Sequence, residues 1–146
     1  MIAFDSDGCI NCRICEDVCS YHFAGAFKPA VSAIRLERAG KFGKISAHVC
    51  TLCEGIAGGS ICVASCPSEA LYLADLGNGW GEVVRFDADL CIACDACQDE
   101  CPEEAVARDE DAETYNICDL CGGDPQCVRW CPEKVLWVAG AVAEVA

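Results

Sequence analysis

The sequence predicts an α+β fold in which short strands and short helices surround four cysteine-rich loops. Three observations predict it. The 146 residues include sixteen cysteines, the cysteines fall into four groups of four with none left over, and the segments around these groups repeat one another. A hydrophobic core does not need so many cysteines, so they must be bonded to sulfur or to metal. The fold is expected to form around those bonds.

The first and third groups have the spacing C-x2-C-x2-C-x3-C, which bacterial ferredoxins use to bind [4Fe-4S] clusters. Three cysteines at this spacing wrap a loop around one cluster, and the fourth, on a helical turn beyond, reaches a second cluster. The spacing therefore predicts paired clusters. The four groups are Cys9, Cys12, Cys15, Cys19; Cys50, Cys53, Cys62, Cys66; Cys91, Cys94, Cys97, Cys101; and Cys118, Cys121, Cys127, Cys131.

The second and fourth groups keep C-x2-C at the start and C-x3-C-P at the end, with eight and five residues in the middle interval. A longer interval costs little, because loop-closure entropy grows only logarithmically with length. The longer one holds the segment Glu54 to Ser60, which suits a surface bulge or a loop against a partner. Structural zinc is the alternative for the second group, since two C-x2-4-C pairs separated by a loop are a common zinc layout.

An internal repeat supports the same interpretation for all groups. "FDSDGCINCRIC" from Phe4 aligns without a gap with "FDADLCIACDAC" from Phe86. After the last cysteine, "CPSEALYL", "CPEEAVAR" and "CPEKVLWV" share a proline, two polar residues and an apolar strand. The proline ends the turn that carries the fourth cysteine. The expected unit is a cluster loop, a helical turn and a strand, repeated four times.

Composition limits location and partners. The N-terminus has no basic and apolar leader, so a cytoplasmic location is expected, where disulfides are rare. The formal charge of -14 disfavours nucleic acid. The longest apolar run, Val135 to Ala143, falls far short of the roughly 20 residues that span a bilayer, so no direct membrane insertion is expected. Eight acidic residues between Asp99 and Glu113 form either a solvated face or a docking face for a basic partner.

No catalytic residue is predicted. The sequence offers no nucleophile with a paired base and no phosphate-binding loop, because "GIAGG" lacks the required pattern. His22 and His48 lie near cysteines and are expected to be hydrogen-bonding neighbours or exposed, since all sixteen cysteines already serve as ligands. Catalysis is therefore expected on another subunit.

With these motifs in place, the chain resembles the four-cluster ferredoxin-type subunits that conduct electrons in complexes of the dimethyl sulfoxide reductase and formate dehydrogenase class. The segment "CSYHFAGAFKPAVSAIRL", with Ser20 in place of the expected proline, resembles a compact branch of that family. Members of that branch serve carbon monoxide dehydrogenases, hydrogenase-type complexes and tungsten enzymes of the aldehyde oxidoreductase and benzoyl-coenzyme A reductase type.

The resemblance implies a tandem ferredoxin-like fold in a single compact domain, residues 1–146. An inner dicluster half, residues 50–110, is inserted into an outer half, residues 1–49 plus 111–146. The implied ligand sets of four [4Fe-4S] clusters are Cys9, Cys12, Cys15, Cys131 for cluster 1; Cys118, Cys121, Cys127, Cys19 for cluster 2; Cys50, Cys53, Cys62, Cys101 for cluster 3; and Cys91, Cys94, Cys97, Cys66 for cluster 4.

The function implied is a non-catalytic electron-transfer subunit of anaerobic metabolism. It would relay single electrons between a larger catalytic subunit, of the tungsten or molybdenum aldehyde oxidoreductase type, and an external acceptor or donor such as a further redox subunit or a ferredoxin. Two alternatives stay open, namely a free polyferredoxin that serves several enzymes and a structural zinc protein.

Overall fold

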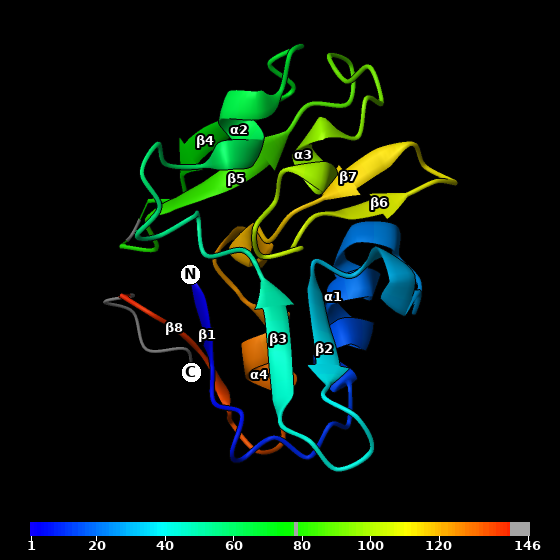
Figure 1. The fold of residues 1–146 in the computed structure, drawn as a ribbon, viewed down its shortest axis with the longest axis vertical. Helices are drawn as coiled ribbons and strands as arrows, with labels where there is room; N and C mark the ends of the chain where they lie inside the picture. The colour runs from blue at the N-terminus through cyan, green and yellow to red at the C-terminus, as the bar shows by residue number, and fades with distance from the viewer. Residues whose placement is uncertain (78, 141–146) are drawn as a thin grey trace.

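The computed structural model describes residues 1–77 and 79–140 (Figure 1). Short strands and short helices alternate along the chain, which confirms the predicted α+β class. The elements in chain order are β1 (Ile2–Phe4), α1 (Ile14–Ala24), η1 (Pro29–Val31), β2 (Ile34–Arg38), β3 (Ile45–Val49), α2 (Ile61–Ser65), β4 (Leu71–Asp75), β5 (Glu82–Phe86), α3 (Ala96–Asp99), β6 (Ala107–Asp109), β7 (Thr114–Asn116), η2 (Leu120–Gly122), α4 (Gln126–Trp130) and β8 (Leu136–Val138).

The strands form antiparallel pairs. Three pairs are hairpins of consecutive strands, β2 with β3, β4 with β5, and β6 with β7, whereas β1 pairs with β8 from the other end of the chain. In that pair Ile2 lies opposite Val138 and Phe4 opposite Leu136. This pairing brings the first and fourth cysteine groups to the same end of the molecule, where α4 packs against α1 and β8 and β1 and β8 lie side by side in Figure 1.

Proline decides where the short helices end. Helices α2 and α4 end just before Cys66 and Cys131, each of which precedes a proline that has no N–H to continue a helix. Helix α1 instead continues past Cys19, because Ser20 stands at that position, and it ends at Gly25. Gly25 adopts a left-handed conformation with φ of 64°, and its N–H donates to the Tyr21 carbonyl at 2.9 Å. The serine in place of proline therefore lengthens the first helix.

Two hydrophobic clusters form the core. The first gathers apolar residues from β1, α1, β2, β3, β8 and the α4 region, including Ile34 and Leu120, with Val83 from β5. The second gathers residues between Cys50 and Ile117, including Leu71 and Val106. Cysteines belong to both clusters, so each core is built around thiols.

Polar contacts join η1 and the residue before it to the segment that contains β6 and β7. The Lys28 ammonium lies 2.8 Å from Asp109 and 2.6 Å from Asp111. The buried Asn116 side chain donates to the Val31 carbonyl at 2.9 Å. Part of the acidic stretch between Asp99 and Glu113 is thus neutralised within the chain. The β6–β7 hairpin also crosses the boundary expected between residues 110 and 111, and the division into halves stays a prediction.

None of the helices within residues 1–77 and 79–140 combines the length and apolar character needed to cross a bilayer. Positions 141–143 of the apolar run near the C-terminus lie outside the described residues.

Candidate metal centres

The third cysteine of every group is buried on a helix, and the first two precede that helix, in a loop or, for Cys121, in the short helix η2. These buried cysteines are Cys15 of α1, Cys62 of α2, Cys97 of α3 and Cys127 of α4. The fourth cysteine follows one turn later. Since a helical turn covers 3.6 residues, the C-x3-C spacing brings the third and fourth cysteines near the same face of the helix.

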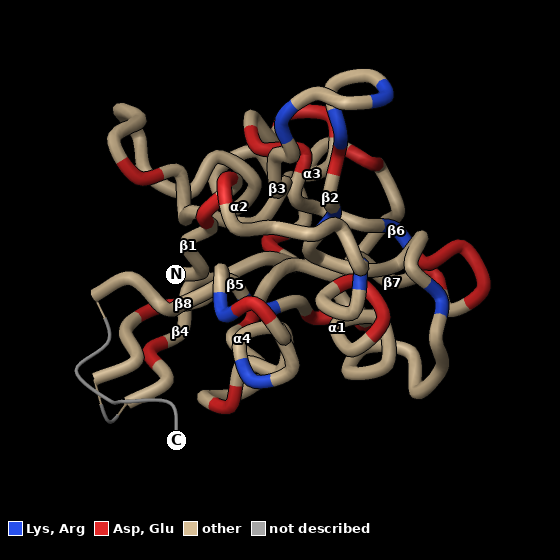
Figure 2. The backbone as a smooth tube through the Cα atoms, turned by 90° about the horizontal axis from the view of Figure 1, so that it is seen from below, with Lys and Arg blue, Asp and Glu red and all other residues tan. Residues whose placement is uncertain are grey.

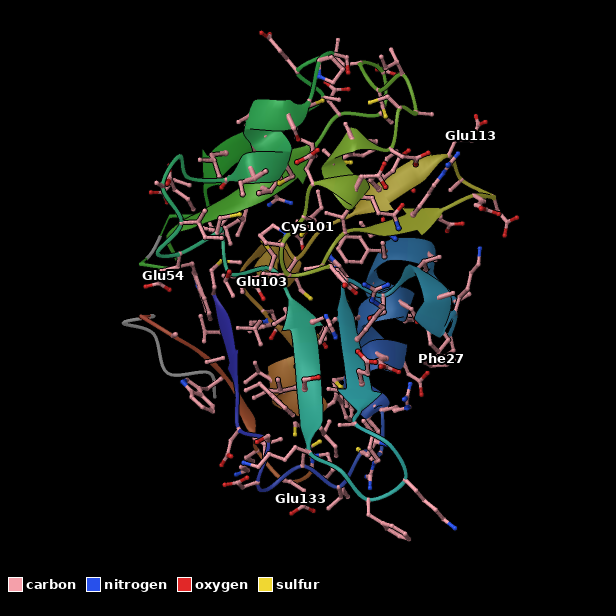
Figure 3. The ribbon with its side chains drawn as sticks, in the orientation of Figure 1. Phe27, Glu54, Cys101, Glu103, Glu113 and Glu133 are labelled. Atoms are coloured by element: carbon pink, nitrogen blue, oxygen red, sulfur yellow. The ribbon has the colours of Figure 1, made fainter. Side chains whose placement is uncertain are left out.

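Three cavities each bring together three cysteines of one group and the fourth cysteine of a different group. The first contains Cys62 from α2 and Cys101 from the turn after α3, and its other walls include Val84, Val106 and Ile117. Figure 3 labels Cys101 between α3 and the end of β3. The cysteines that line this cavity are Cys50, Cys53, Cys62 and Cys101.

The other two cavities repeat this exchange. One is lined by Cys19 of α1 together with three cysteines of the fourth group, with Phe23 and Ile34 among its walls. The other is lined by Cys66 together with three cysteines of the third group, with Leu71 and Phe86 among its walls. The cysteines concerned are Cys19, Cys118, Cys121, Cys127 in one cavity and Cys66, Cys91, Cys94, Cys97 in the other.

The remaining cysteines lie at the end of the molecule where β1 pairs with β8. Cys9 and Cys131 pack against the same hydrophobic cluster, which includes Cys15. Helix α4, which Cys131 follows, packs against α1, which carries Cys15. Cys12 is exposed. The structure thus brings the first group and the last cysteine of the fourth group to one end.

Backbone N–H groups point at several sulfur atoms. The N–H groups of Asn11, Leu52 and Ala93 lie 3.4 Å from the sulfur two residues earlier in the chain. All three residues have a positive φ, between 53° and 57°. The first three loops share this left-handed turn, which points a backbone N–H at a cysteine sulfur. Hydrogen bonds to sulfur are one of the factors that set the reduction potential of an iron-sulfur cluster.

Burial makes several of these thiols poor acids. It raises the pKa of Cys15 and of Cys62 to about 12 and the pKa of Cys50 to about 11. A thiol with so high a pKa gives up its proton less readily than a free cysteine does. A bound cationic cluster would compensate the buried thiolates and release the protons. Four converging thiols, apolar walls and N–H donors fit a [4Fe-4S] cluster.

Neighbouring cavities approach one another through cysteine pairs. The pKa of Cys118 is raised by burial, and the nearby sulfur atoms of Cys19 and Cys50 add to the effect. The pKa of Cys127 is raised by burial and also by several sulfur atoms, including that of Cys15. Cys62 and Cys97 belong to one hydrophobic cluster. Each centre therefore has a neighbour.

The carboxylate of Asp119 organises the fourth loop, a role that sequence reasoning missed. It accepts hydrogen bonds from the Cys121 N–H at 2.8 Å and from Arg85 at 3.1 Å, and the His22 ring lies 3.1 Å away. Burial opposes the charge, but His22 and the other donors hold the pKa of Asp119 below its usual value. The signal was the aspartate directly after Cys118, a residue type that bonds the N–H two positions on.

The two histidines are hydrogen-bonding neighbours, as expected. His22 contacts Asp119. The His48 ring lies 3.2 Å from the Glu103 carbonyl, in the turn beyond Cys101, and 3.1 Å from Glu37. The imidazole, the carboxylate and the thiol of His22, Asp119 and Cys121 also lie close enough together to hold a metal ion. Because Cys121 lines a four-cysteine cavity, this trio is best understood as the edge of that centre.

Replacing Ser68 by alanine should lower the reduction potential of the centre that contains Cys66. The Ser68 hydroxyl lies 3.6 Å from the Cys66 sulfur and helps lower the pKa of that thiol against the effect of burial. A hydrogen bond worth about 1 kcal/mol to the reduced cluster corresponds to about 40 mV for one electron. A redox titration followed by electron paramagnetic resonance would measure the shift.

The matched control is Ser65→Ala, because the Ser65 hydroxyl donates to the Cys62 carbonyl and not to sulfur. An equal shift in both variants, or none in Ser68→Ala, would contradict the assigned hydrogen bond.

Comparison with known families gives an independent identification of the centres. The 4Fe-4S dicluster domain family matches residues 49–105, which contain the second and third groups. The sixteen cysteines in ferredoxin-like motifs fit four [4Fe-4S] clusters.

Two relatives match nearly the whole chain. The polyferredoxin-like subunit of an aliphatic sulfonate oxidoreductase from Pyrococcus furiosus is 35% identical over 133 residues, which is 90% of this chain and 71% of the relative. The beta subunit of an NADH-dependent phenylglyoxylate dehydrogenase from Aromatoleum evansii is 33% identical over 92% of this chain, but the match covers only 29% of that protein.

Among solved structures, a chain of the active site complex BamBC of benzoyl-coenzyme A reductase has a similar fold. The TM-score is 0.51 at 24% sequence identity, and the match covers 94% of this chain and 76% of that chain. This likeness concerns the fold alone. By its sequence likeness to the Pyrococcus subunit over nine-tenths of its length, the chain belongs to the family of polyferredoxin-like iron-sulfur subunits that transfer electrons in oxidoreductases.

Proposed function

We propose that the chain relays single electrons through four [4Fe-4S] clusters between a larger catalytic subunit and an external acceptor or donor. The observation that carries the proposal is the exchange of fourth cysteines between groups. Cys66 lines the cavity of the third group and Cys101 that of the second. Two clusters bound there would be linked by this exchange and would lie close together. Neighbouring clusters of this kind pass electrons without further machinery.

The ligand sets proposed for the clusters are those implied by the family resemblance, and the three cavities support clusters 2, 3 and 4. For cluster 1, the support is the common location of Cys9, Cys15 and Cys131. The proximity of Cys127 to Cys15 and of Cys118 to Cys50 suggests the order 1, 2, 3, 4 along a single path.

The partner we propose is a tungsten or molybdenum oxidoreductase of the aldehyde oxidoreductase type, in an anaerobic organism. The support is the resemblance of the segment from Cys19 to Leu36 and the likeness to two relatives that are named as subunits of oxidoreductases. The chain itself would supply electron transfer, and no catalytic residue is proposed on it. The substrate belongs to the partner.

Metal analysis of the anaerobically purified protein tests the cluster content. We expect about sixteen iron and sixteen sulfide ions per chain, because each cubane holds four of each. Zinc in place of iron would overturn the proposal in favour of a structural zinc protein, and about twelve iron ions with zinc would place zinc at one centre.

Purification through a tag on this chain separates a subunit from a free carrier. A larger protein in fixed ratio, with tungsten or molybdenum in the same fraction, is the expected result. A chain that carries four clusters but elutes alone would favour a free polyferredoxin.

A further inference from the structure

The turn between β2 and β3 presents an aromatic ring to solvent. Phe42 is 87% exposed, more than any other large apolar side chain that the structure describes. The Lys41 ammonium lies 5.4 Å from the centre of the Phe42 ring. A single exposed phenylalanine is common on protein surfaces, so Phe42 indicates a binding surface only together with the charges and the cysteine group that lie around it.

This turn is also basic, in contrast to the rest of a strongly acidic chain. The seven residues from Arg38 to Lys44 include three cations, Arg38, Lys41 and Lys44, and no acidic residue. Residues 50–110 hold two basic and thirteen acidic residues. Figure 2, which views the molecule from this end, shows blue segments around the turn that follows β2 and red segments on the turn between β6 and β7.

Most of this positive charge is available to a partner. The Lys44 ammonium lies 3.5 Å from the Asp7 carboxylate, but both side chains are more than 80% exposed, so the pair is weak. Lys41 and Arg38 make no ion pair within the described part of the chain, residues 1–77 and 79–140.

The turn is held in one shape. The Ala39 N–H donates to the Lys44 carbonyl at 3.0 Å, which closes the hairpin. Gly43 packs so closely on the Ala39 backbone that a Cβ atom would overlap the Ala39 carbonyl. A closed, tightly packed turn restricts the backbone that carries Lys41 and Phe42, which lowers the entropy cost of ordering this segment on binding.

The turn lies beside the first cysteine group. The contact between Lys44 and Asp7 joins it to the loop that leads to Cys9. In that loop Cys12 is exposed, and Ile10 is 59% exposed. We call Ile10, Arg38, Lys41, Phe42 and Lys44 the hairpin-tip surface. It combines an aromatic anchor with cations, and it lies beside Cys12, an exposed cysteine of a proposed cluster.

We propose that the hairpin-tip surface docks the large subunit, through a pocket that receives the Phe42 ring and is rimmed by aspartate and glutamate. Charge complementarity points to this partner, because three cations around an apolar anchor match an acidic rim and repel a basic one. One buried aromatic ring commonly supplies a large share of binding energy. The inference rests on the proposed function, in which cluster 1 exchanges electrons with a protein.

Phe42→Ala tests the anchor, with Phe27→Ala as the matched control. Phe27 is also a highly exposed phenylalanine, at 70%, but it stacks on Tyr21 of α1, away from the turn. The complex is isolated anaerobically through a tag on this chain, and its dissociation constant is measured for each variant. We expect at least a tenfold weaker complex for Phe42→Ala and little change for Phe27→Ala. Equal affinities in both variants would overturn the proposal.

Zero-length cross-linking tests the acidic rim directly. A carbodiimide joins a lysine amine to a carboxylate in contact, and the chain contains only four lysines. We expect Lys41 or Lys44 to be joined to aspartate or glutamate of the large subunit, and the double variant Lys41→Glu, Lys44→Glu to bind more slowly. Cross-links from Lys28 alone, or unchanged binding of the double variant, would overturn the proposal.

Iron content keeps these results apart from a failure of the proposed function. Every variant should retain about sixteen iron ions per chain, since the side chains exchanged lie at the surface. A wild-type chain without four clusters would reject the proposed function. If the wild-type chain holds four clusters but binds the large subunit through another surface, only the proposed docking site is rejected.

Discussion

Removal of iron and sulfide with a chelator under anaerobic conditions is expected to unfold the chain. All sheets among the described residues are two-stranded, and an isolated pair of strands is marginally stable in water. The two hydrophobic clusters include buried cysteines, among them Cys15 and Cys127 in the first and Cys62 and Cys97 in the second. The energy of cluster binding is therefore folding energy, as in small metalloproteins generally.

Small-angle scattering and far-UV circular dichroism measure this outcome. The radius of gyration should rise from about 15 Å, the value for a compact chain of this length, towards about 40 Å for an unfolded one. The control is protein carried through the same steps without chelator, and a second control restores iron and sulfide. An apoprotein that stays compact with native helix and strand content would show that packing alone holds the fold.

Loss of Cys66 is expected to destroy the cluster held by the third group and not the cluster of its own group. Cys66 lines the cavity that contains Cys91, Cys94 and Cys97. The electron paramagnetic resonance spectrum of reduced Cys66→Ala should therefore lack one cluster signal. The same signal should be missing from the spectrum of reduced Cys94→Ala. By the same argument, Cys101→Ala should match Cys53→Ala. In each variant, iron should fall from about sixteen to about twelve ions per chain.

The prediction would be wrong if the spectrum of reduced Cys66→Ala lacked the same cluster signal as the spectrum of reduced Cys53→Ala. That outcome would mean that the second group closes on its own four cysteines, as a structural zinc site does. Ser65→Ala serves as the control for substitution in α2, because it leaves every sulfur in place. The experiment therefore separates the crossed arrangement from the self-contained one.

Local features of this protein could be predicted from the chain because they depend on neighbouring residues. The C-x2-C spacing places sulfur atoms on one tight loop, and the loops share left-handed residues such as Asn11 and Ala93. Proline after Cys66 and Cys131 ends α2 and α4, whereas Ser20 lets α1 continue to Ala24. The repeated sequence motifs around the cysteines were enough to predict the α+β class and the four [4Fe-4S] clusters.

Contacts between distant segments depend on how the whole chain returns on itself. Cavities lined by cysteines of two groups, the carboxylate of Asp119 between His22 and Arg85, and the bridge from Lys28 to Asp109 all join residues far apart in the chain. Sequence spacing says which residues can share a loop, since covalent geometry limits their separation. Which loops then meet is decided by strand pairing, such as β1 with β8, and by burial of apolar side chains. The type of cluster could therefore be predicted from the local sequence around the cysteines. The exposure of Phe42 beside the first group was decided only by the tertiary structure.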